Sequence, residues 1–195
     1  MPRLAVRRYD AVAMSLHWLI AALLIANIAL AWYFNTLTGL AKIPPVQLHK
    51  SFGITILILS VLRLAWRFIS PAPRLPLSVR TWERIGSAIV QGLFYVIMLG
   101  MPLSGWALTS ASRLIQVYPI MLYGVIHWPA IGPLTRLPLD QMKSAHQLFV
   151  TTHGLLAWLA YGLIVLHVSA AVRHCFILRD GVAERMIPFL RARPA

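Results

Sequence analysis

The chain has 195 residues, of which 59% are hydrophobic and only 12% are charged. Soluble domains carry about 25% charged residues, so the composition excludes an ordinary soluble protein and predicts one that lies in the lipid bilayer. The net charge of +13 could suit nucleic acid, but the basic residues lie mostly between long apolar runs. That placement is typical of the flanks of membrane spans, and we expect no nucleic-acid partner.

Four apolar segments are long enough to cross a bilayer. The predicted spans are residues 11–34, 48–69, 85–108 and 148–172. Pro102 and Gly105 are expected to kink or thin the third helix. The sequence therefore predicts an all-α protein, a four-helix transmembrane bundle that forms a single integral membrane domain over residues 1–195.

The distribution of Lys and Arg predicts the orientation of these spans. Most of the 18 basic residues fall in the two tails or in and beside the connection between the second and third spans. The positive-inside rule then puts both termini in the cytoplasm. Residues 70–77, which are rich in proline, are expected to form a stiff cytoplasmic linker. The basic residues assigned to the cytoplasmic side are Arg3, Arg7, Arg8, Arg63, Arg67, Arg74, Arg80, Arg84, Arg173, Arg179, Arg185, Arg191 and Arg193.

Residues 114–131 are also apolar and have two interpretations. The segment contains Pro119, His127 and Pro129, and a fifth span there would move the Arg-rich C-terminal tail to the outer side. We therefore favour a long outer loop, in which an interfacial helix could lie over the membrane face. A fifth span is the alternative. In the favoured interpretation His127 is a surface residue.

Four histidines fall within the predicted spans, and an imidazole ring in a bilayer is costly enough to indicate a functional site. His153 and His167 are 14 residues apart. That spacing is about 40° short of four full turns, so both rings leave nearly the same helix face, about 21 Å apart along the axis. The expected depths then pair His17 with His167 (the inner pair) and His49 with His153 (the outer pair).

Each pair could bind one haem iron from opposite sides of the macrocycle. The five acidic residues lie outside the apolar centres, which disfavours a zinc or di-iron site rich in carboxylates. With both axial positions filled, iron has no open site and outer-sphere electron transfer is favoured. The alternative is a non-redox membrane protein in which the histidines hydrogen-bond across helices.

Two further residues could meet a cofactor or substrate near the inner pair. Arg63 follows His49 by 14 residues, so we expect it on the same helix face at the inner end. There it could pair with a haem propionate, or it could simply anchor the span. His174 follows His167 by seven residues and could hydrogen-bond a quinone carbonyl or a propionate; an interfacial histidine without a ligand is the alternative.

On the outer side, Lys50 and Arg113 are candidates for propionate or quinone contacts. His146 precedes His153 by seven residues and could replace it as a ligand, but the residue 14 positions further on would then be Ala160. A positive funnel could speed the capture of a small anion, although plain basic loops are the alternative. The basic residues of this side are Lys42, Lys50, Arg113, Arg136 and Lys143.

Three stretches carry a family resemblance. They are RYDAVAMSLHWLIAALLI at 8–25, LHKSFGITILILSVLRLAWR at 48–67 and HGLLAWLAYGLIVLHVSAAVRHCFILRDGVAERMIP at 153–188. The pattern resembles the bacterial di-haem cytochrome b561 family of inner-membrane proteins. The resemblance implies four helices, two b-type haems bound at the matching positions His17, His49, His153 and His167, and electron transfer involving quinone. The chain departs from the family at Cys175, where a second histidine often follows, and over residues 109–146, which are hard to match.

The resemblance also implies a function. The chain is expected to pass electrons between a periplasmic donor and membrane quinone, with ubiquinone as the expected substrate. The donor could be superoxide, which family members oxidise while they reduce ubiquinone, or a redox protein. The alternative is a haem-bearing membrane anchor of a larger complex such as a hydrogenase or a dehydrogenase.

Overall fold

The computed structural model describes residues 8–73 and 79–187. Four of its helices are long and apolar enough to cross a membrane, which confirms the predicted four-helix bundle. A helix pairs its own backbone groups, so apolar segments of this length form helices in lipid. The four are α1 (Ala11–Asn35), α2 (Ile43–Ile69), α3 (Thr81–Ser110) and α5 (Leu139–Val172).

Shorter elements connect and extend these helices. They are η1 (Gly39–Lys42), η2 (Arg113–Gln116), β1 (Ile120–Leu122), β2 (Ile126–Trp128), α4 (Gly132–Thr135), η3 (Arg173–Leu178) and η4 (Ala183–Arg185). The η3 segment is a π-helical continuation of α5. Parts of two predictions lie outside the described residues: the proline-rich linker from residue 74 on, and five of the arginines assigned to the cytoplasm. Those five are Arg3, Arg7, Arg74, Arg191 and Arg193.

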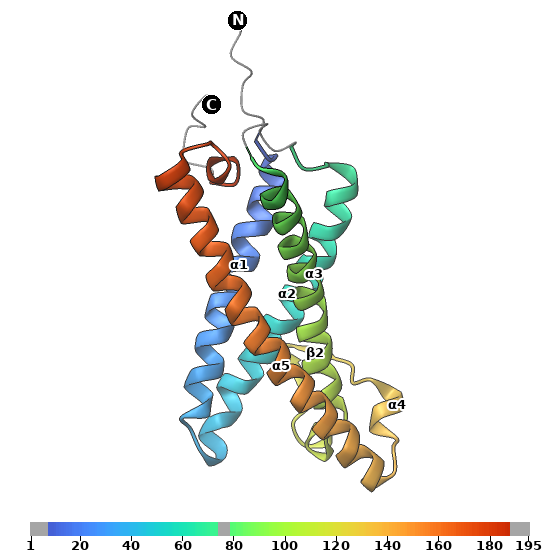
Figure 1. Ribbon diagram of the computed structural model, residues 1–195. Helices are drawn as coiled ribbons and strands as arrows, with labels where there is room; N and C mark the ends of the chain where they lie inside the picture. Colours follow the sequence, from blue (N-terminus) through green and yellow to red (C-terminus); the bar gives the residue numbers. More distant parts are fainter. Residues whose placement is uncertain (1–7, 74–78, 188–195) are drawn as a thin grey trace, which may run out of the picture.

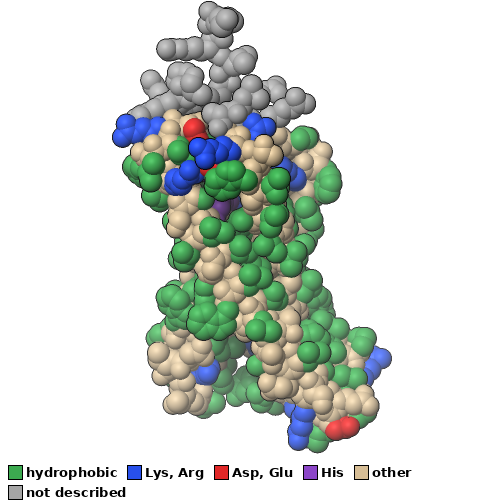
Figure 2. Space-filling model, in the orientation of Figure 1, with side chains coloured by type: hydrophobic (Ala, Val, Ile, Leu, Met, Phe, Trp, Pro, Cys, Tyr) green, Lys and Arg blue, Asp and Glu red, His purple; other side chains and the backbone are tan. Residues whose placement is uncertain are grey.

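The bundle consists of two helix pairs. Helix α1 packs along α2, α3 packs along α5, and α2 and α3 join the pairs (Figure 1). By contrast, the backbone of α5 makes few close approaches to α1 or α2. Apolar side chains cover the middle of the molecule and basic side chains gather at its two ends (Figure 2). The buried core residues shared between the helices are Ile20, Ile56, Ile97, Met98, Ala160 and Leu163.

Both described ends of the chain lie at the same end of the bundle (Figure 1). The backbone N–H of Tyr9 donates to the carbonyl of Arg185 at 3.3 Å. Asp10 caps the first turn of α1 by accepting from the N–H of Ala13 at 2.9 Å. Its carboxylate also accepts from Trp66 Nε1 (3.0 Å) and from the Ser70 hydroxyl (2.7 Å), so the start of α1 is tied to the end of α2.

Residues 114–131 form neither a fifth span nor an interfacial helix. The segment begins in η2, and its residues 120–128 fold as a β-hairpin in which β1 and β2 pair antiparallel, with Met121 opposite His127. The segment connects the third and fourth spans as predicted, but the interfacial helix that it could have held is replaced by this hairpin. Pro119 and Pro129 bracket only nine residues, and the turn takes left-handed backbone at Tyr123 (φ 53°) and Gly124 (φ 75°). His127 is exposed, as predicted.

Two helices differ in detail from the predicted spans. Helix α3 continues through Pro102 to Ser110, so the proline does not end it. Helix α5 begins at Leu139, well before the apolar segment, with Asp140 in its first turn. A carboxylate there suits the positive end of the helix dipole, which favours helix beyond the apolar part of the sequence.

Candidate functional site

The four histidine rings come together in two pairs. The ring centres of His17 on α1 and His167 on α5 are 6.2 Å apart, with their planes at 68°. The ring centres of His49 on α2 and His153 on α5 are 6.3 Å apart, with their planes at 73°. These are the inner and outer pairs that the sequence predicted. Their role as iron ligands stays a prediction.

The spacing within each pair suits two imidazoles on one iron. Metal–imidazole bonds are about 2.0 Å long, and a ring nitrogen lies about 1.2 Å from the centre of its ring, so two opposed ligands have ring centres roughly 6.4 Å apart. Within residues 8–73 and 79–187, no group of three or more His, Cys, Asp or Glu side chains could hold a metal ion. Each pair could therefore supply only two of the ligands of a metal ion, and a cofactor such as haem would have to supply the rest.

In the outer pair, backbone carbonyls hold the ring proton of both histidines on Nδ1. His49 Nδ1 lies 3.2 Å from the carbonyl oxygen of Asn27, and His153 Nδ1 lies 3.1 Å from that of Met101. A carbonyl oxygen only accepts, so both Nδ1 atoms carry the proton. Nε2 of each ring is then left with a free lone pair, the arrangement that metal-bound histidines adopt. Ser104 Oγ also accepts from His153, at 3.0 Å.

Gly105 leaves room for the His153 ring. A Cβ atom at this position would lie 3.2 Å from His153 Cε1, closer than most side-chain contacts, and 3.5 Å from Nδ1. The ring of Phe34 packs edge-on against His49, with ring centres 5.3 Å apart. The outer pair is therefore held between a close backbone approach on α3 and an aromatic ring on α1.

The inner pair is held differently. Arg63 Nη1 lies 3.0 Å from His17 Nδ1. A guanidinium only donates, so His17 Nδ1 is unprotonated here and the ring proton sits on Nε2. Phe94 packs edge-on against His167, with ring centres 5.4 Å apart. Arg63 lies at the inner pair, as its 14-residue spacing from His49 predicted.

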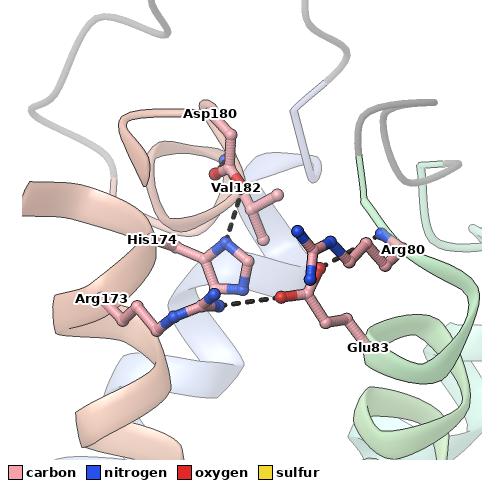
Figure 3. A network of polar contacts seen from close by, with 6 residues as sticks. All are labelled: Arg80, Glu83, Arg173, His174, Asp180 and Val182. Carbon is pink, nitrogen blue, oxygen red and sulfur yellow. Dashed lines mark hydrogen bonds and ion pairs between the residues drawn. The ribbon is translucent and has the colours of Figure 1, made fainter. Parts of the chain in front are cut away.

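A polar network lies at the end of α5, beyond His167 along the chain (Figure 3). Arg173 Nη1 and Glu83 Oε1 form an ion pair at 2.9 Å, which joins α5 to the start of α3. His174 Nδ1 contacts Asp180 Oδ2 at 2.7 Å, so its partner in this structure is a carboxylate of the same chain. The left-handed backbone at Arg179 (φ 51°) turns the chain back to bring Asp180 there.

The remaining candidates lie at the other end of the bundle. Lys50 follows His49 on α2 and is half-buried. Arg113 is exposed and lines a cavity of about 320 Å³ between η2 and the start of α5. His146 Nδ1 donates to the carbonyl of Leu108 at 2.8 Å, whereas His153 is the ring that meets His49.

Sequence reasoning missed several residues of the site. Ser104, Gly105 and the carbonyl of Met101 act on His153 from another helix, and no local pattern indicates which helix lies there. One signal was present: Asn27 is a polar residue in the middle of an apolar span, and its side chain is buried.

Comparisons with known proteins agree with this architecture. The family described as prokaryotic cytochrome b561 matches residues 8–189. The chain belongs to this family. It is therefore a multi-pass bacterial membrane protein of electron transfer, and cytochrome b561 membership implies that it binds b-type haem.

Individual relatives of the cytochrome b561 family are distant but cover most of the chain. Cytochrome b561 homolog 2 of Escherichia coli K12 is 28% identical over 92% of this chain and 91% of its own length. A Yersinia pestis protein named probable superoxide oxidase CybB is 26% identical over 93% of this chain and 97% of its own length. Cytochrome b561 homolog 1 of Escherichia coli K12 is 24% identical over 73% of this chain and 74% of its own length.

Proposed function

We propose that the chain is a single integral membrane domain that holds two b-type haems, one at each histidine pair. It passes electrons across the bacterial inner membrane between a periplasmic donor and membrane quinone. The observation that carries this proposal is the pair of equal ring spacings, 6.2 Å and 6.3 Å, presented on one helix by His167 and His153.

The chain's own residues would prepare each site. A haem between two imidazoles supplies a one-electron carrier without an open axial position. The carbonyls of Asn27 and Met101 hold the outer rings with Nε2 free. At the inner pair, Nε2 of His17 is freed only when Arg63 leaves Nδ1. We expect the Arg63 guanidinium to form an ion pair with a haem propionate instead, because a charged carboxylate is a stronger hydrogen-bond acceptor than a neutral imidazole.

The proposed orientation puts both termini in the cytoplasm. It is supported by the arginines of the described residues, most of which lie at the end of the bundle where the two chain ends meet (Figure 2). A quinone ring at this end would find hydrogen-bonding groups in Arg173 and His174. Ubiquinone is the proposed substrate, which makes the chain a quinone-linked oxidoreductase.

The proposed donor is superoxide, with a periplasmic redox protein as the second candidate. Support comes from the name of the Yersinia pestis relative, whose alignment spans nearly all of both chains. The outer end also carries Lys42, Lys50, Arg113, Arg136 and Lys143 near only one acidic residue, Asp140. The positive electrostatic potential of these residues would speed the association of a small anion.

The spectrum of the purified protein tests the cofactor proposal. Dithionite should produce a b-type α-band, and haem extraction should give about two haems per chain. A protein without that band would contradict the haem assignment, and one haem per chain would contradict the second site.

Stopped-flow mixing with superoxide tests the donor. The haems should be reduced, and the rate should fall as ionic strength rises because salt screens the basic outer end. A rate that does not change with salt would contradict electrostatic steering. Reduction only by a periplasmic redox protein would replace superoxide as the donor.

A further inference from the structure

The β-hairpin of β1 and β2 runs alongside α2 and extends into its apolar part. Three α2 residues one turn apart hold it: Gln47, Ser51 and Thr55. Gln47 Nε2 donates to the carbonyl of Pro119 at 2.9 Å, Ser51 Oγ accepts from the N–H of Tyr123 at 2.9 Å, and Thr55 Oγ1 meets the Tyr123 hydroxyl at 2.7 Å. The contacts span about 12 Å of the helix axis.

The hairpin points along α2 toward the middle of the bundle, so its turn lies deeper than the outer end of α2. Along α2 from the outer pair, Lys50 is the last charged residue before Arg63. Thr55, which meets Tyr123, lies about 7 Å beyond Lys50 along the helix. The backbone of Tyr123 therefore lies level with Ser51, and its side chain reaches Thr55 in the uncharged part of α2.

The backbone donors of the turn are satisfied within the protein. Besides Tyr123, the N–H of Gly124 donates to the carbonyl of Met121 at 3.4 Å and that of Val125 to the carbonyl of Leu122 at 3.0 Å. Hairpins in water also make such turn bonds, but a backbone segment in lipid requires them, because unsatisfied groups there cost several kcal/mol. The donors of this turn meet that requirement.

The side chains of the turn are apolar and uncovered. Val125 is 80% exposed and Ile126 is 60% exposed. No Asp, Glu, Lys or Arg occurs from residue 114 to residue 135. On α2 the exposed residues Ile58 and Leu62 lie on the same helix face as Thr55, so the apolar tip continues the lipid-facing stripe of a membrane-spanning helix.

We propose that this hairpin is a lipid-inserted element: its tip, Tyr123–Ile126, lies among the acyl chains of the leaflet at the outer-pair end of the bundle. The partner is the bilayer itself. On the protein side, Trp128 of β2 packs against Trp106 of α3, the helix that carries Gly105, with ring centres 5.7 Å apart. The proposal does not depend on haem or on the donor.

Thiol labelling tests the insertion. In a Cys175→Ser background, Val125→Cys is reconstituted as one copy per nanodisc of phosphatidylethanolamine and phosphatidylglycerol and treated with a charged, membrane-impermeant maleimide. Only a hydrated thiolate reacts, so labelling should be at least about tenfold slower than at Lys143→Cys, the water-exposed control. The labelling rate of Val125→Cys should be close to that of Ile58→Cys, the lipid-facing control. Ile126→Cys repeats the measurement, and labelling in SDS shows that each thiol is intact.

Two outcomes would overturn the proposal. Val125→Cys could react as fast as Lys143→Cys, which would put the tip in water. The tip could instead be protected only in discs that hold two copies, which would make a second chain its partner. Bound haem and the elution volume of each variant report folding, and the side chain of Val125 is exposed enough for its replacement to leave the packing unchanged.

Discussion

The two histidine pairs have the same spacing but are held by different kinds of group. Backbone carbonyls fix the outer pair, through Asn27 for His49 and Met101 for His153. A side chain, that of Arg63, holds His17 of the inner pair. Carbonyls of packed helices keep the ring proton on Nδ1, whereas a guanidinium can exchange partners. The outer site is therefore preset by the fold, and the inner site responds to charge.

Removing one ligand gives the largest expected effect and tests the pairing itself. His153→Ala should lower the haem content from about two per chain to about one, because only the outer pair loses a ligand. Haem extraction and a redox titration would identify the haem that is lost. His146→Ala is the matched control on the same helix and should keep both. Loss of both haems from a folded His153→Ala protein would contradict two independent sites.

Crowding the outer ring should break its preset geometry. In Gly105→Ala the new methyl group would lie 3.2 Å from His153 Cε1, so the ring must shift, at an overpacking cost of about 1–3 kcal/mol. We expect weaker retention of the outer haem and an altered α-band, measured during gel filtration and by low-temperature spectra. In the control Gly100→Ala, the methyl group meets Leu156 Cδ1 at an ordinary 3.7 Å. Equal haem loss in both variants would show that the close approach is unimportant.

Neutralising Arg63 should affect only the inner haem. In Arg63→Gln a positive charge is lost beside His17, which favours the oxidised form, so the inner midpoint potential should fall by about 60 mV, a tenfold change for a one-electron couple. A spectroelectrochemical titration resolves the two haems. Arg67→Gln removes the same charge one turn further along α2 and should have a smaller effect. An equal shift of both haems would argue against a local contact.

The smallest expected effect is the acid sensitivity of the inner end. The Ser70 hydroxyl, followed by the N–H of Ala13, lowers the pKa of Asp10 from its ordinary value. The ionised carboxylate therefore stabilises the fold above the ordinary carboxyl pKa, and this stability is lost as the pH falls through the lowered pKa. Asp10→Ala should lower the free energy of unfolding by about 1 kcal/mol at neutral pH and by less in acid.

Thermal unfolding in detergent at neutral and acid pH would measure this difference. Asp10→Asn keeps a capping acceptor without the charge and should lose less stability at neutral pH. A difference between wild type and Asp10→Ala that stays constant with pH would show that the charge of Asp10 does not tie α1 to α2.

The sequence alone determined the features that depend on local periodicity. Apolar run length gave four spans, since a helix must cover the thickness of the bilayer. The 14-residue spacing of His153 and His167 put both rings on one face, because helix geometry is the same wherever the helix packs. Basic residues at the span ends assigned the depths, and the depths predicted which rings meet.

Only the tertiary structure decided the features that depend on which helices touch. The carbonyl of Met101 meets His153 because α3 packs along α5, and no pattern within either helix encodes that register. Residues 114–131 were predicted as a long loop with a fifth span as the alternative, but hydrophobicity did not predict the hairpin at residues 120–128 or its contacts with Ser51 and Thr55 of α2. The hydrogen-bond partners of the histidine ring nitrogens are likewise contributed by other helices. These partners distinguish the inner pair from the outer pair, which the local sequences around the histidines do not.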